Sequence, residues 1–103
     1  MANIIAMNIS LLKQKTSPEI AEILAENVRK RRKERKLTQA DLAKRSGVSL
    51  GSVKRFESSG EISLKFLLNI AIVLECEDDF LELFTRRHYK TIEDLINANN
   101  KLS

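Results

Sequence analysis

The apolar positions that follow residue 18 recur at helical spacing. They fall on one face of a helix, and they are Ile20, Ile23, Leu24 and Val28. Ser17 followed by Pro18 favours a helix start, because Ser caps a helix and Pro loses nothing at the first helical position. Acidic residues lie near this start and basic residues near the other end, and both placements suit the helix dipole. We predict a helix over residues 18–36.

Two shorter helices are predicted next, joined by a tight turn. Thr38 with Asp41 three residues later resembles a capping box and opens a helix over 39–45. Gly47 lies where the chain needs a positive φ, and Ser49 is placed to cap a helix over 50–58. The residues expected to face inward and hold the two helices together are Leu42, Ala43, Val48, Val53 and Phe56.

Two further helices complete the predicted bundle. Ser63 is placed to cap a helix over 64–75, and the broad apolar face of this helix indicates burial on more than one side. Asp78 or Asp79 opens a short helix that continues to Thr85. The apolar residues of this short helix form either core or a dimer seam, and they are Phe80, Leu83 and Phe84.

Short helices joined by brief connections predict an all-α bundle of five helices. We expect a helical domain over 17–85, preceded by an N-terminal extension, 1–16, and followed by a C-terminal tail, 86–103. Residues 3–15 are apolar without clear periodicity and suit a short helix or an added strand equally. A capping pattern in the tail predicts a frayed helix near 92–98.

Composition is ordinary for a globular protein of 103 residues, with 43% apolar residues. No apolar run is long enough to span a membrane, and the first residues lack the pattern of a secretory signal. The only cysteine, Cys76, has no partner for an internal disulfide. These features predict a cytoplasmic protein.

Charge is distributed unevenly along the chain. The formal net charge is +4, but the segment from Arg29 to Arg55 holds eleven Lys or Arg against two acids. That segment therefore carries +9, and the rest of the chain carries −5. Concentrated positive charge is typical of a polyanion partner, although a charge run is also what a solvated helix face looks like.

Catalytic chemistry finds little support in the residue types. The chain has one His, one Cys and no Gly-rich phosphate loop, so no nucleophile–base pair can be assembled. The acidic cluster that begins at Glu75 lacks the spacing and the central Gly of a calcium loop. We therefore expect no enzyme activity, no cofactor and no metal.

The two short helices and their turn predict the binding surface. Small and apolar residues lock the helices over 39–45 and 50–58 together, which leaves one face of the second helix exposed. An α-helix fits the major groove of B-DNA. This arrangement predicts sequence-specific binding of double-stranded DNA.

Residues 28–84 resemble the Xre/Cro/phage-repressor family of five-helix, lambda-repressor-like DNA-binding domains. The residues that carry the resemblance are Leu37-Thr38-Gln39, Asp41-Leu42-Ala43, Ser46-Gly47-Val48-Ser49 and Val53 through Glu57. The resemblance implies that the helix over 50–58 is the recognition helix, the one that enters the DNA groove. It also implies that Gln39 binds a DNA phosphate and braces this helix. It also implies an ion pair between Glu57 and Arg32.

By the same resemblance, six residues face the DNA groove: Ser49, Leu50, Gly51, Ser52, Lys54 and Arg55. From the basic run we expect Arg31 and Lys33 to contact phosphates, with a solvated helix face as the alternative. The alternative for Arg55 is a surface ion pair with Glu57 or Glu61.

Two of these residues depart from the family pattern, which usually places polar side chains early in the recognition helix. Leu50 can touch a thymine methyl but cannot donate a hydrogen bond. Gly51 reads no base and weakens the helix by about 1 kcal/mol relative to Ala. Direct readout then rests on Ser52, Lys54 and Arg55, and we expect modest specificity per half-site.

The leading hypothesis is a transcriptional regulator, more specifically a repressor, that acts as a homodimer on a palindromic operator. Two recognition helices would enter successive major grooves about 34 Å apart. An alternative comes from residues 52–84, which resemble HipB-type antitoxins, proteins that bind DNA and also hold a kinase-like toxin. A further alternative is an interaction adaptor on the same fold without DNA binding.

Overall fold

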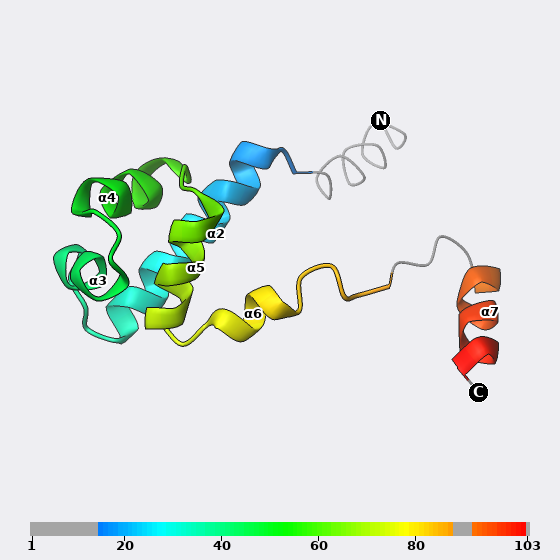
Figure 1. Ribbon diagram of the computed structural model, residues 1–103. Coiled ribbons are helices and arrows are strands. Elements are labelled where there is room, and N and C mark those ends of the chain that lie inside the picture. Colours follow the sequence, from blue (N-terminus) through cyan, green and yellow to red (C-terminus); the bar gives the residue numbers. More distant parts are fainter. Residues whose placement is uncertain (1–14, 88–91, 103) are drawn as a thin grey trace, which may run out of the picture.

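The computed structural model describes residues 15–87 and 92–102, and every regular element in these ranges is a helix (Figure 1). The helices are α2 (Ser17–Glu34), α3 (Gln39–Ser46), α4 (Leu50–Ser59), α5 (Leu64–Val73), α6 (Glu77–Leu81) and α7 (Ile92–Leu102). The all-α prediction is confirmed. Residues 3–15, for which a short helix or an added strand was expected, lie outside the described residues except for Lys15.

The start of α2 is displaced by one residue from the prediction. Thr16, not Ser17, is the N-cap, and its hydroxyl accepts a hydrogen bond from the amide of Glu19 at 3.3 Å. Pro18 consequently occupies the second helical position, where its missing N–H is still without cost.

The end of α2 comes two residues earlier than predicted. The helix stops at Glu34, and Lys36 adopts a left-handed conformation with φ of 57°. The Leu37 amide then donates to the Arg32 carbonyl at 3.2 Å, and the Leu37 side chain is buried. The basic run cannot continue as a helix because the chain must reverse to bring Leu37 into the core.

The predicted caps of α3 and α4 are present. Thr38 and Asp41 form a reciprocal capping box, with hydrogen bonds of 3.0 and 2.9 Å. Gly47 ends α3 in the left-handed conformation, and the Ser49 hydroxyl accepts from the amide of Ser52 at 3.1 Å. Each of these helices runs one residue further than predicted, which is ordinary variation at a helix end.

The last two helices of the bundle are shorter than predicted. Ser63 caps α5 as expected, but the helix ends at Val73, and Glu75 turns left-handed. α6 has only five residues and ends at Leu81, and Phe84 beyond it adopts a φ of 65°. A helix of one turn has few internal hydrogen bonds, and α6 has no fully buried side chain to hold it. In the tail, α7 extends past the predicted range of 92–98.

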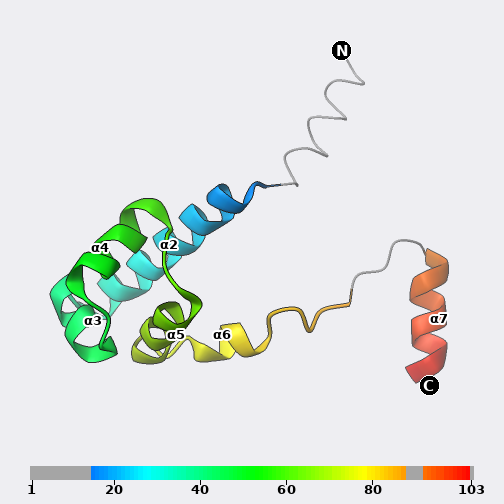
Figure 2. The same cartoon turned by 45° about the horizontal axis from the view of Figure 1, so that its top comes forward.

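The core lies where α2, α3, α4 and α5 meet. α4 packs against α2 and α3, and α3 also packs against α5. The largest of the most deeply buried side chains are Phe56, Leu42, Ile70, Val48 and Val53. Figures 1 and 2 show α6 leading away from the end of α5, with α7 separate from the bundle. This packing exposes the side of α4 opposite Val53 and Phe56.

Two glycines provide a matched test of the fold. Gly47 and Gly60 end α3 and α4 with φ of 73° and 80°. A Cβ on Gly47 would meet nothing within 4 Å, whereas one on Gly60 would lie 2.8 Å from the Ala21 carbonyl carbon. Gly47→Ala should therefore cost about 1–2 kcal/mol of left-handed strain. Gly60→Ala should cost about 2–5 kcal/mol, because overpacking against α2 adds to the same strain.

Urea unfolding of both variants measures the two losses. Equal losses would contradict the close approach of Gly60 to α2.

Candidate nucleic-acid interface

The exposed surface of the helix pair is the outer side of α4. On the inner side of α4, Val53 and Phe56 are buried. On the outer side, Gly51, Lys54 and Arg55 are exposed. Leu50, the first residue of α4, is 38% exposed. α4 is thus held against the bundle by one face and open to a partner along the other.

The two serines at the start of α4 bond to each other. The Ser49 hydroxyl donates to the Ser52 hydroxyl at 2.8 Å while it caps the Ser52 amide. Ser52 is half-buried, and with Arg55 it lines a small hollow toward α5. The first role of Ser49 and Ser52 is structural, because together they cap the N-terminus of α4.

Behind α4 lies an ion pair between Arg32 and Glu57. Nε and Nη2 of Arg32 donate to the two carboxylate oxygens of Glu57, each at 2.8 Å. The third group, Nη1, donates to the Leu37 carbonyl at 2.8 Å. The two side chains are only 9% and 4% exposed. The structure therefore brings together the two residues for which the family resemblance implied a pair.

Gln39 completes this network from the first residue of α3. Its amide Nε2 donates to Oε1 of Glu57 at 3.1 Å. Burial favours a raised pKa for the Glu57 carboxyl, but hydrogen bonds from Arg32 and Gln39 lower the pKa below its ordinary 4.5. The pKa of Arg32 is raised, chiefly by its hydrogen bonds to Glu57. Both groups stay charged at neutral pH, and they link α2, α3 and α4.

A polar cleft of about 490 Å³ opens over this network. Its lining comes from α2, α4 and the start of α3, and it consists of Arg29, Arg32, Thr38, Gln39, Lys54, Glu57 and Ser58. Glu57 is neutralised by Arg32, so the remaining positive charge comes from Arg29 and Lys54, which are both exposed. Such a cleft is suited to an anionic group.

The basic residues of α2 point in different directions. Arg31 pairs with Glu34 at 3.0 Å and lines an apolar groove between α2, α5 and α6, which shares no lining residue with the polar cleft. Arg35 pairs with Glu75 at 2.7 Å and so connects the ends of α2 and α5. Lys33 is exposed and does not line the polar cleft. Neither Arg31 nor Lys33 is thus grouped with the residues around α4.

Arg29 was not among the predicted site residues, although the structure places it in the cleft. The helical repeat could have identified it, because Arg29 precedes the buried Arg32 by three residues and so shares its face. A count of positive charges along the chain does not distinguish the faces of a helix.

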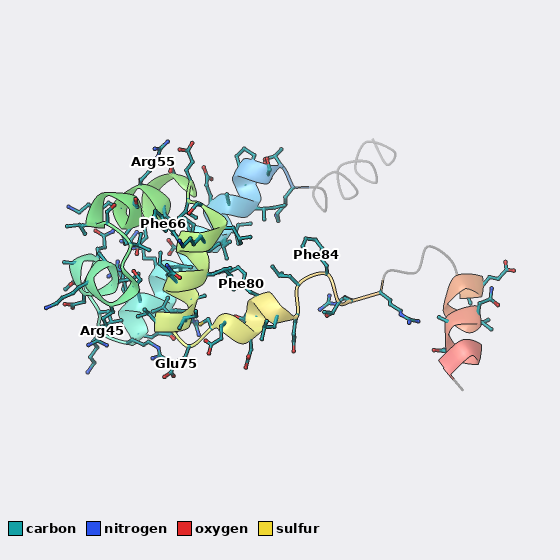
Figure 3. The ribbon with its side chains drawn as sticks, in the orientation of Figure 1. Arg45, Arg55, Phe66, Glu75, Phe80 and Phe84 are labelled. Carbon is teal, nitrogen blue, oxygen red and sulfur yellow. The ribbon has the colours of Figure 1, made fainter. Side chains whose placement is uncertain are left out.

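Arg55 forms an ion pair with Glu61, one of the alternatives weighed for it from the sequence. Both side chains are more than 60% exposed, and Figure 3 shows Arg55 extending outward from α4. An exposed pair of this kind contributes little to stability and can be exchanged for another anion.

The three apolar residues predicted as core or dimer seam differ in burial in the structure. Phe80 is half-buried against the cluster around Phe56, whereas Leu83 is 54% exposed and Phe84 is fully exposed. Figure 3 shows Phe80 beside α5 and Phe84 on the segment beyond α6. Only Phe80 belongs to the core.

Within the described ranges, no three His, Cys, Asp or Glu residues are grouped in a way that could hold a metal ion. Among the described helices, none has the length and apolar character needed to cross a membrane.

Residues 28–81, slightly more than half of the chain, match a family model described as "Helix-turn-helix". The match includes the last seven residues of α2 and all of α3, α4, α5 and α6. No solved structure matches the chain.

The Arg32–Glu57 pair predicts a specific dependence of stability on pH. The pKa of Glu57 is lower in the folded chain than its ordinary 4.5, so ionised Glu57 stabilises the fold at higher pH. This contribution is complete above the ordinary pKa and is lost as pH falls through the folded value. Glu57→Ala should cost about 3–5 kcal/mol at pH 7, because it leaves Arg32 buried without its partner.

Urea unfolding between pH 7 and pH 3 tests both parts. The difference in unfolding free energy between wild type and Glu57→Ala should shrink below pH 4.5. A difference that stays constant across this range would show that Glu57 is not ionised and paired in the folded chain.

Proposed function

This chain belongs to the helix-turn-helix family, and from that premise we propose that it is a transcriptional regulator that binds double-stranded DNA sequence-specifically. The observation that carries the proposal is the outer side of α4, where Lys54 and Arg55 stand exposed beside the positively charged cleft. A helix held by one face and basic on the other can enter the major groove of B-DNA.

The two basic residues of α4 would do different work in the groove. Arg55 extends outward, and on binding it would leave Glu61 and donate its guanidinium to a base edge, guanine being the usual partner. Lys54 lies at the cleft with Arg29, and there the two cations would hold a phosphate of the DNA backbone. Arg29 takes the place of Arg31 in this proposal, because Arg31 lies at the apolar groove.

Gln39 contributes to the same phosphate site. Its amide is held by Glu57 at 3.1 Å, which fixes the side chain at the start of α3. An amide group carries two N–H bonds, so one remains for a phosphate oxygen. The role expected from the sequence, a phosphate contact that also braces the recognition helix, is compatible with this hydrogen bond.

We further propose a homodimer on a palindromic operator, acting as a repressor by covering the DNA that it binds. One α4 offers few groups that can read bases, since Leu50 and Gly51 cannot hydrogen-bond through their side chains. Two copies on one face of the DNA would double the contacts and so give useful affinity. Leu83 and Phe84, both exposed, remain candidates for the dimer seam.

The division of labour between Arg55 and Lys54 can be measured. Arg55→Ala should cost about 1–3 kcal/mol on the best site, found by selection from a random library, and little on random DNA. Lys54→Ala should weaken both kinds of DNA complex similarly. It should also flatten the plot of log affinity against log salt, by about 0.9 for each phosphate that the variant no longer neutralises.

The ion-pair partner of Arg55 provides the matched control. Glu61→Gln frees Arg55 and should strengthen binding to the best site by less than about 1 kcal/mol. An affinity of the wild type that does not change with salt would exclude DNA as the partner. Equal losses from Arg55→Ala on both kinds of DNA would place Arg55 on phosphate.

Gly51 yields a test in which stability and binding move in opposite directions. A Cβ on Gly51 would meet nothing within 4 Å, so the fold does not require glycine there. Gly51→Ala should therefore stabilise the folded chain, by up to about 1 kcal/mol. If α4 lies close in the groove, the added methyl should also weaken binding to the best site.

Thermal unfolding and operator titration of the same variant give the two readouts. A stabilised variant that binds as tightly as the wild type would show that Gly51 does not approach the DNA.

A further inference from the structure

An apolar groove of about 440 Å³ lies open between α2, α5 and the α6 segment. Its exposed walls are Ile20 and Ile23 from α2, at 53% and 45% exposure, and Leu83 at 54%. Apolar surface gathered in a concavity, and rimmed by Arg31 and Asp79, is typical of an interaction site. The groove is separate from the polar cleft, with which it shares no lining residue.

The same chain carries a second apolar surface without a partner, on α7. Ile92 and Ile96 are four residues apart and therefore share a face, and they are 77% and 51% exposed. Glu93 and Asp94 follow Ile92, and Asn97 follows Ile96. An amphipathic helix needs an apolar surface to cover this face.

The connection between the two surfaces is short. Eight residues, 84–91, lie between Leu83 at the groove and Ile92 at the start of α7. Fully extended, they span about 30 Å. α7 could thus reach the groove of its own chain or that of a neighbouring copy.

Two observations favour the neighbouring copy. In both views α7 stands apart from its own bundle (Figures 1 and 2). In addition, Leu81 at the end of α6 and Phe84 just beyond the groove are 74% and 100% exposed. A chain that folds back on itself would cover the groove but leave these two residues exposed. Two chains that exchange their last helices would run these segments together and cover them.

We propose that α7 of each copy packs into the apolar groove of a second copy, by reciprocal exchange about a two-fold axis. The proposal rests on the dimeric regulator proposed above and names the surfaces that form the dimer. Such an interface is isologous and closes at two copies. It uses the groove side of α2 and leaves α4 and the polar cleft of both copies open.

The single native cysteine provides a direct probe, because Cys76 lines the groove. In the full chain, Ile96→Cys would place a second thiol on the apolar face of α7. Mild oxidation followed by a non-reducing gel should then give a covalent dimer, with Cys76 of one copy bonded to the introduced thiol of the other. Asn97→Cys is the control, since the next residue lies about 100° further around the helix and should give several-fold less dimer.

Three results would overturn the proposal. A monomer with an internal disulfide would place α7 in the groove of its own chain. Equal yields of dimer from the two variants would mean that no particular face of α7 packs into the groove. Absence of any disulfide with Cys76 would mean that α7 does not enter the groove.

A second pair of variants tests the groove without cysteine chemistry. Ile23→Asp charges the groove wall, whereas Ile72→Asp charges an α5 residue that is 58% exposed and does not line the groove. By sedimentation, the first should raise the dimer dissociation constant at least tenfold, and the second should leave it unchanged. Equal effects of the two variants would overturn the proposal.

The same preparations separate this proposal from the DNA-binding proposal. Ile23→Asp should keep the salt-dependent binding to random DNA that each α4 provides, and should lose affinity for the selected operator. If the Ile96→Cys variant forms the crosslinked dimer but the wild type binds no DNA, the α7 exchange stands and the regulator is refuted. If the wild type binds the operator tightly but the Ile96→Cys variant gives no crosslink, the regulator stands and the α7 exchange is refuted.

Discussion

The buried ion pair between Arg32 and Glu57 holds α4 against α2, and the direction in which the outer side of α4 faces depends on it. Arg32 uses its three donor groups, two for Glu57 and one for the Leu37 carbonyl. The bond to Leu37 holds the reversal that ends α2, and the bonds to Glu57 hold α4 against α2. Gln39 adds the start of α3. A buried charge is costly unless it is paired and hydrogen-bonded, so these four residues have one favourable arrangement. Hydrogen bonds are directional, whereas apolar contacts are not, so this network adds an angular constraint on α4 to that of the packing.

The same pair determines which charges remain for a partner. Arg32 and Glu57 neutralise each other, so the polar cleft owes its positive character to Arg29 and Lys54. Arg55 is paired as well, but with Glu61 at the surface, where exchange for another anion costs little. Of the eleven basic residues from Arg29 to Arg55, four are in ion pairs, and of the remaining seven only Arg29 and Lys54 line the polar cleft.

Local signals predicted most of the fold. Thr38, Ser49 and Ser63 cap their helices as expected, since capping depends on residues within one turn. The first cap was misplaced by one residue, because Thr16 and Ser17 are equally able to cap and the sequence does not choose between them. The ends of α2 and α5 were placed too late for a different reason. Two residues beyond the end of each helix lies a left-handed residue other than glycine, Lys36 and Glu75, and only tertiary packing demands that conformation.

The residues of the candidate site were likewise predicted only in part from the sequence. The family resemblance implied the pairing of Arg32 with Glu57, whereas the choice among the neighbouring basic residues missed Arg29, although its three-residue spacing from Arg32 could have guided it. Arg29 and Arg32 line the polar cleft, and Arg31 lies at the apolar groove. Successive residues of a helix are 100° apart, so a run of basic residues must spread around the axis. Two faces of α2 thereby differ. One supports α4 and lines the polar cleft, and the other exposes Ile20 and Ile23. In the proposed dimer, α2 contributes one face to DNA binding and the other to the association of two copies, and each surface is available without disturbing the other.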